Sequence, residues 1–169
     1  MPQKKTQALQ AAKERRDAAL QQMASSVPYI NFLGVEFERR GDELTTTLPF
    51  TEMLIGNPFL PALHGGTTAA FLEITAVMEL MCAIIWPQME KGGPVADAIA
   101  RDEFPSMPKT IDFTVDYLRT GLPRDAYARA RVNRSGRRYA SVHVEAWQDD
   151  KNQIFAQATG HFLMPELIT

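Results

Sequence analysis

The fold is decided by residues 56–86, GNPFLPALHGGTTAAFLEITAVMELMCAIIW. This stretch opens with a Pro-rich loop, turns at His64-Gly65-Gly66, and continues in a long apolar run that predicts a buried helix. One carboxylate, Glu73, stands early in that run among alanine, phenylalanine, leucine and isoleucine. Because a buried carboxylate is costly unless it is paired, Glu73 is the first candidate functional residue.

The sequence around this helix predicts an antiparallel sheet. Alternating apolar and polar side chains predict two strands before the helix and four after it, at 35–40, 44–50, 111–117, 127–133, 139–147 and 154–164. Further helices are predicted over 4–24 and, within a long Pro- and Gly-rich connection at 87–108, over 95–101. The fold class is therefore α+β, with a sheet wrapped around one long central helix and an additional N-terminal helix. Since a second copy commonly covers an open sheet edge, we expect a homo-oligomer.

Length and composition narrow the function classes. The 169 residues predict one domain, and a formal net charge of -2 gives no general attraction to nucleic acid or anionic membranes. The single cysteine, Cys82, excludes an internal disulfide framework and a Cys-rich zinc site. The N-terminal segment lacks the apolar region of a signal peptide, and the apolar run at 69–86 is shorter than a membrane span of about 20 residues. We therefore expect a cytoplasmic protein without a nucleic-acid or membrane partner.

Four stretches, taken together and in order, resemble hotdog-fold acyl-CoA thioesterases of the phenylacetyl-CoA/hydroxybenzoyl-CoA thioesterase type. They are NFLGVEFERRGDELTTTLPF (31–50), LHGGTTAAFLEITA (63–76), TIDFTVDYLRTG (110–121) and ARVNRSGRRYASVHVEAWQDDKNQIFAQATGHFL (130–163). The resemblance divides the chain into an N-terminal helical extension, 1–26, and a thioesterase-like domain, 27–169. It implies that an acyl-CoA is hydrolysed to a carboxylic acid and free CoA.

The resemblance also assigns roles around the central helix. Thioester hydrolysis needs a donor for the carbonyl oxygen and a nucleophile or base for the carbonyl carbon. A Gly-Gly turn that opens a helix offers free N–H groups, and the resemblance makes the Gly65 amide the oxyanion donor. It makes Glu73 either the nucleophile or the general base for water, and both roles stay open. His64 is expected to support the turn, and Glu79, about 120° away around the helix, is expected to be structural.

Further candidates lie outside the helix. Asn57, seven residues before His64 where the family usually has six, matches an asparagine associated with the substrate carbonyl or attacking water. Thr110 matches a hydroxyl that some members supply from the facing strand across a dimer. The nucleotide phosphates of coenzyme A are expected near a basic hairpin formed by Arg134, Ser135, Gly136, Arg137 and Arg138. No metal and no cofactor are expected, because coenzyme A enters as part of the substrate.

Two other function classes remain open. A hotdog dehydratase or hydratase acting on acyl-CoA or acyl-ACP also carries an acid on the helix, but it relies on an upstream histidine that residues 51–63 lack. A non-catalytic acyl-CoA-binding protein would bind the thioester without releasing thiol. The sequence does not identify the acyl group, the choice between a dimer and a dimer-of-dimers tetramer, or the roles of the N-terminal helix and the 87–108 segment.

Overall fold

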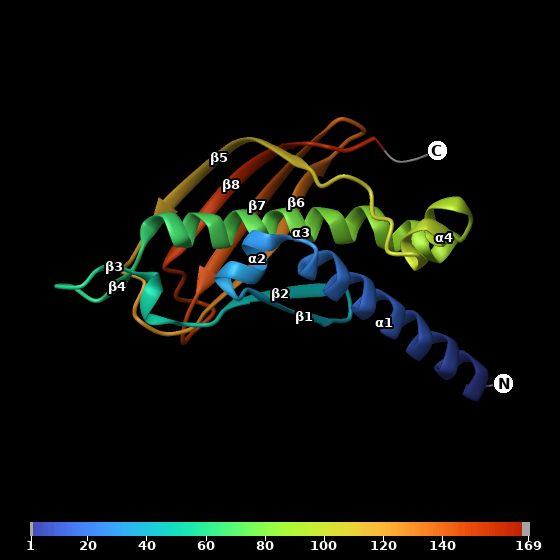
Figure 1. The fold of residues 1–169 in the computed structure, drawn as a ribbon, viewed down its shortest axis with the longest axis horizontal. Coiled ribbons are helices and arrows are strands. Elements are labelled where there is room, and N and C mark those ends of the chain that lie inside the picture. Colours follow the sequence, from blue (N-terminus) through green and yellow to red (C-terminus); the bar gives the residue numbers. More distant parts are fainter. Residues whose placement is uncertain (1, 167–169) are drawn as a thin grey trace.

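The computed structural model describes residues 2–166 and consists of a curved antiparallel sheet wrapped around one long helix (Figure 1). The helices are α1 (Pro2–Ser25), α2 (Pro28–Leu33), α3 (Gly65–Lys91) and α4 (Pro94–Ala100), with a 3-10 turn at Glu52–Leu54. The main sheet contains β1 (Glu36–Arg40), β2 (Glu43–Leu48), β5 (Lys109–Tyr117), β6 (Ala126–Ser135), β7 (Tyr139–Trp147) and β8 (Ala156–Leu163). The predicted α+β arrangement is confirmed.

The strands of the main sheet follow the order β1-β2-β6-β7-β8-β5, and every neighbouring pair is antiparallel. Strand β7 shows why they pack against α3, because its inward row Ala140, Val142, Val144 and Ala146 is fully buried. The ladder between β2 and β6 is short, since it contains three residue pairs between Thr46–Ala128 and Leu48–Ala126. This is the shortest ladder of the main sheet, and we call it the seam between β2 and β6.

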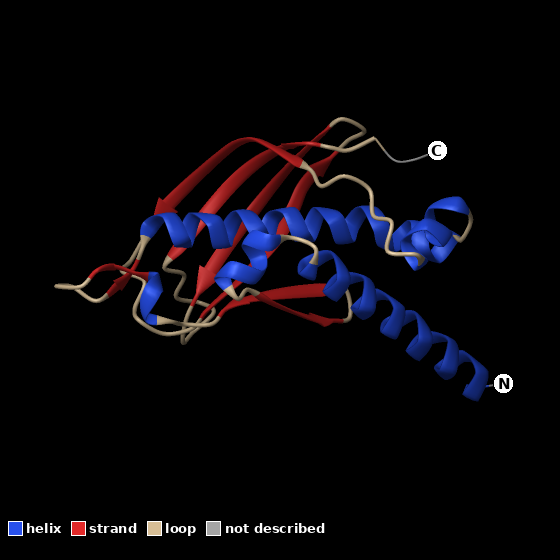
Figure 2. Ribbon diagram, viewed as in Figure 1, coloured by secondary structure: helices blue, strands red, loops and turns tan. Residues whose placement is uncertain are grey.

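Helix α3 forms the centre of the core. Its buried side chains point in nearly all directions, as expected for a helix enclosed by a sheet on one side and α1 and α2 on the other (Figure 2). By length and composition alone α3 could span a membrane, but 56% of its most apolar window is buried inside the protein. Such burial is typical of the core helix of a globular domain.

The predicted end of the central helix at Trp86 is wrong, because α3 continues through Pro87 to Lys91. A proline inside a helix leaves the carbonyl four residues earlier without its N–H donor. Here that residue is Ala83, and both Ala83 and Pro87 are exposed, so water can replace the missing donor. Gly92 and Gly93, with φ of 73° and 88°, then reverse the chain into α4, which confirms the short helix predicted in this segment.

The C-terminal half of α1 shares the core of the domain. Ala19, Leu20, Met23 and Ala24 are buried, and Leu20 and Met23 are each only 1% exposed. The N-terminal half extends away from the body (Figure 1). The predicted N-terminal extension is thus a helix whose second half packs like any core element.

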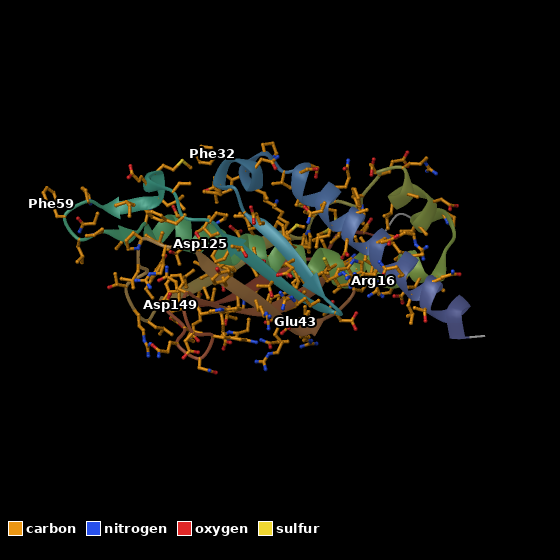
Figure 3. All side chains as sticks on the ribbon, turned by 90° about the horizontal axis from the view of Figure 1, so that it is seen from below. Arg16, Phe32, Glu43, Phe59, Asp125 and Asp149 are labelled. Carbon is orange, nitrogen blue, oxygen red and sulfur yellow. The ribbon has the colours of Figure 1, made fainter. Side chains whose placement is uncertain are left out.

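The Pro-rich loop before α3 contains a small hairpin that was not predicted, formed by β3 (Ile55–Asn57) and β4 (Ala62–Leu63). The hairpin protrudes from the body, and Phe59 at its tip is 98% exposed (Figure 3).

Candidate active site

The Gly-Gly turn is held by contacts on three sides. His64 is the N-cap of α3, and its Nδ1 accepts a hydrogen bond from the Gly66 N–H at 2.9 Å. The Tyr117 hydroxyl donates to the Gly65 carbonyl at 2.8 Å. Gly56 packs directly against His64, since a Cβ at that position would lie 2.7 Å from the His64 Cα. These contacts agree with the supporting role predicted for His64.

The turn leaves the Gly65 N–H available at the start of α3. Within residues 2–166, no acceptor binds the Gly65 N–H, whereas the Gly66 N–H is bound by His64 and the Thr68 N–H by the His64 carbonyl. Gly65 is also exposed. Since the helix dipole adds positive potential here, the Gly65 N–H is suited to bind an oxyanion.

The Glu73 carboxylate has a defined partner. The Thr110 hydroxyl donates to Glu73 Oε1 at 2.6 Å, and both side chains are half-buried. The resemblance placed a hydroxyl from a partner chain at this position, but here Thr110 and Glu73 belong to the same chain. The hydroxyl therefore fixes the orientation of the carboxylate before any partner binds.

A β-bulge directs Thr110 toward α3. Thr110 pairs with Phe162 and Asp112 pairs with His161, so Ile111 has no partner residue on β8. In a regular strand Thr110 and Phe113 would point to opposite faces. The extra residue lets both point inward, which is the local redirection that bulges produce near functional sites.

Glu73 and Gly65 are not in contact within one chain. Eight residues of helix separate them, which corresponds to about 12 Å along the axis and about 80° around it. The sequence led us to expect both groups at one thioester carbonyl. Within one chain the two groups are therefore too far apart to contact the same carbonyl group.

Asn57 does not contact Glu73 either. Its Oδ1 accepts hydrogen bonds from the Phe59 and Leu60 N–H groups, at 3.0 and 3.3 Å. The asparagine thus stabilises the tip of the β3–β4 hairpin, away from the body (Figure 3). Within the described chain its side-chain carbonyl serves the turn, and its predicted substrate contact stays a prediction.

The basic hairpin lies at the end of the sheet nearest Thr110. Tyr139 and Lys109 both pair with Leu163, so the β6–β7 turn and the start of β5 share one end of the sheet. With about 4.8 Å between strands, β7 lies about 10 Å from β5. All five hairpin residues are exposed, and none of its three arginines has an acidic partner among residues 2–166. These cations remain available for phosphate groups.

Strict alternation over 111–117 predicts one inward row of Ile111, Phe113, Val115 and Tyr117, and the structure places two of these side chains differently. Tyr117 was assigned to the inward row of its strand, so its hydrogen bond to Gly65 was missed. Ile111 was assigned to the same row, although the bulge leaves it 60% exposed. No group of three His, Cys, Asp or Glu side chains in the described part of the chain is placed to hold a metal ion.

Glu79 lies on α3 apart from this site, and it borders a hollow together with residues of β2 and β6. It is half-buried, and within the described residues no hydrogen bond or ion pair satisfies its carboxyl group. It lines two adjoining hollows of about 570 and 260 Å³, whose walls also include Asp42. Burial raises the pKa of Glu79 from 4.5 to about 7.

We expect Glu79→Gln to stabilise the protein above pH 7 and to leave its stability unchanged near pH 4.5. The folded state holds the proton more tightly than the unfolded state, so wild-type stability falls as the pH rises from about 4.5 to about 7. With partial solvent screening, the penalty above pH 7 is about 1–3 kcal/mol. Thermal unfolding at pH 8 should therefore shift upward by about 2–12 °C in the variant.

Glu36→Gln serves as the control, because Glu36 is exposed and its carboxylate has no hydrogen-bond or ion-pair partner within residues 2–166. That variant should change the melting temperature by the same small amount at both pH values. An equal shift at pH 4.5 and pH 8 in Glu79→Gln would contradict the burial argument.

Comparison with known proteins gives consistent matches. A family model described as the thioesterase superfamily matches residues 60–155. A medium/long-chain acyl-CoA thioesterase, YigI, from Salmonella typhimurium is 30% identical over 140 residues, covering 82% of this chain and 86% of YigI.

Solved structures agree with this match. A protein from Chromobacterium violaceum is 31% identical with a TM-score of 0.62, covering 94% of this chain and 99% of that one. A Bacillus halodurans protein solved with CoA is 17% identical with a TM-score of 0.61, covering 95% of this chain and 94% of that one. The predicted resemblance and hotdog fold are confirmed.

Proposed function

This chain belongs to the thioesterase superfamily, and from that premise we propose that it hydrolyses medium- or long-chain acyl-CoA thioesters. Water adds to the thioester carbonyl carbon, the carbon–sulfur bond breaks, and a carboxylic acid and the free thiol of coenzyme A are released. The acyl-chain length rests on the name of the relative YigI, which is 30% identical.

The observation that carries the proposal is the carboxylate of Glu73, oriented at 2.6 Å by Thr110 on the helix that begins with the free Gly65 N–H. Glu73 either attacks the carbonyl carbon or removes a proton from the attacking water. Gly65 binds the negative charge that develops on the carbonyl oxygen. The arginines of the basic hairpin bind the phosphates of coenzyme A.

The working enzyme in this proposal is a homodimer or a dimer of dimers. Strand β5 is an edge of the sheet, and Ile111 and Tyr117 on it are 60% and 56% exposed. The separation of Gly65 from Glu73 supports a site in which Gly65 of one chain and the carboxylate of the other chain flank the same thioester. A cytoplasmic location, the absence of a cofactor and the absence of a nucleic-acid or membrane partner stay predictions.

A panel of acyl-CoAs with a thiol-trapping reagent tests the proposal. We expect thiol release from hexanoyl-, decanoyl- and palmitoyl-CoA, with the highest kcat/KM among the longer chains and a lower value for phenylacetyl-CoA. Binding of decanoyl-CoA without thiol release would instead identify a binding protein. Hydration of an unsaturated acyl-CoA without thiol release would identify a hydratase.

A further inference from the structure

A hollow of about 400 Å³ lies between α1, α4 and the last turns of α3. Its apolar wall is formed by six side chains: Ala18, Ala19, Met89, Ala96, Ile99 and Ala100. The volume and the mostly apolar lining match those of small-molecule sites. We call this hollow the α1–α4 groove.

The groove follows from the sequence of the two helices. Four of its six apolar side chains are alanines, so α1 and α4 leave space between them that larger side chains would fill. The positive φ angles of Gly92 and Gly93 fold α4 back beside the end of α3. Ala19 and Ile99 also belong to the buried core, so the floor of the groove is part of the packed interior.

The polar rim of the groove consists of Arg15, Gln22 and Asp102. Arg15 has no acidic partner within residues 2–166, whereas the next residue, Arg16, pairs with Asp42 and Glu90. A guanidinium group binds a carboxylate through charge-assisted hydrogen bonds. Asp102, after α4, is the other charged group of the rim and also lacks an ion-pair partner within residues 2–166, so only the α1 side of the rim attracts a carboxylate. A slender apolar chain whose one carboxylate binds Arg15 fits this groove.

The groove is distinct from the site at Glu73. Sixteen residues of α3 separate Glu73 from Met89, which corresponds to about 24 Å along the helix axis. The Gly65 end of α3 is farther still. A ligand in the groove is therefore outside hydrogen-bond reach of Glu73 and Thr110.

We propose that the α1–α4 groove binds a free medium- or long-chain fatty acid, with its carboxylate at Arg15 and its chain against the alanines and Ile99. The identity of this ligand rests on the proposed function, because a fatty acid is the product of that reaction. The groove itself is independent of catalysis.

The test uses the full-length Glu73→Gln chain, so that binding is measured without turnover. Its probe is dodecanoic acid carrying a photoreactive diazirine, below its micelle concentration, with cross-linked peptides mapped by mass spectrometry. We expect labels in α1 and α4 and an affinity for dodecanoate at least about tenfold above that for dodecanol. Labels confined to α3 near residue 73 and to β5 would overturn the proposal.

Two further variants in this background test the groove chemistry. Arg15→Glu should weaken dodecanoate binding about tenfold or more, and Ala96→Phe should remove the α1 and α4 labels by filling the groove. Lys13→Glu is the matched control, because it makes the same charge change at an exposed α1 position outside the groove. Unchanged binding in Arg15→Glu would refute the proposal even if Ala96→Phe does not fold.

The outcomes keep the two proposals apart. If wild-type protein releases no thiol from any acyl-CoA but the groove is labelled, the proposed function fails and the groove site stands. If thiol is released but α1 and α4 stay unlabelled, the groove proposal fails and the hydrolase stands.

Discussion

Replacing Glu73 with glutamine is expected to lower kcat for decanoyl-CoA hydrolysis by about 10²- to 10⁴-fold, the range attributed to a positioned acid or base. Glutamine keeps the shape of the side chain and can still accept the Thr110 hydrogen bond. It cannot attack as a carboxylate or remove a proton from water. The initial rate of thiol release, with circular dichroism as the folding check, measures the effect.

The companion variant Thr110→Val removes the 2.6 Å hydrogen bond to Glu73 but keeps the carboxylate. We expect an intermediate loss of about tenfold, because the acid is present but less well oriented. Turnover at the wild-type rate in Glu73→Gln would remove Glu73 from the mechanism. A single turnover in ¹⁸O-labelled water then distinguishes the roles, since label in the Glu73 carboxylate indicates attack through an anhydride.

The second large effect is expected from Gly65→Pro, which should lower kcat by about 10²- to 10³-fold, as loss of one oxyanion donor does. Proline lacks the N–H that we assign to the oxyanion, yet it is favoured at the first position of a helix. His64, with φ of −62° and ψ of 132°, already has the conformation that precedes proline. The variant therefore removes the donor with little change to α3.

Gly65→Ala is the matched control, because alanine retains the N–H. A Cβ at this position would lie 3.4 Å from the Tyr117 hydroxyl, which is ordinary contact, so we expect nearly wild-type activity. Equal losses in the proline and alanine variants would show that the turn needs glycine for space, and that the N–H is not the donor.

Mixing the two inactive variants tests the shared site. If Gly65 of one chain and Glu73 of its partner form each site, a mixed dimer of Gly65→Pro and Glu73→Gln has one intact site. Statistical exchange should then restore about a quarter of wild-type activity. If each site belongs to one chain, the mixture stays inactive.

The central helix and its acid could be predicted because their signals are local. An apolar run after His64-Gly65-Gly66 predicts a buried helix, and a single carboxylate within it is conspicuous. The extension of α3 beyond Trp86 could not be predicted, because the tolerance of Pro87 depends on the exposure of Ala83. That exposure is a property of the tertiary structure.

The geometry around Glu73 was less predictable for the same reason. A strict alternation in β5 places Ile111 and Thr110 on opposite faces. The bulge depends on how β5 pairs with β8, and it changes which side chains reach α3. Pairing partners are not encoded in the periodicity of one strand.

The contact between Tyr117 and Gly65 spans 52 residues of sequence. An aromatic residue in an alternating strand is usually interpreted as core, and nothing local distinguishes Tyr117 from Phe113. The hydroxyl group is the available hint, since a tyrosine that packs against other elements usually donates its hydrogen bond.

The seam between β2 and β6 has a consequence for how the domain opens. Three residue pairs join the β1–β2 ribbon to a meander whose own ladders are much longer. Helix α1 contacts the same ribbon through the ion pair between Asp17 on α1 and Arg39 on β1. We therefore expect the amide hydrogens of the β1–β2 ribbon to exchange with solvent faster than those of β6, β7 and β8, as hydrogen exchange would measure.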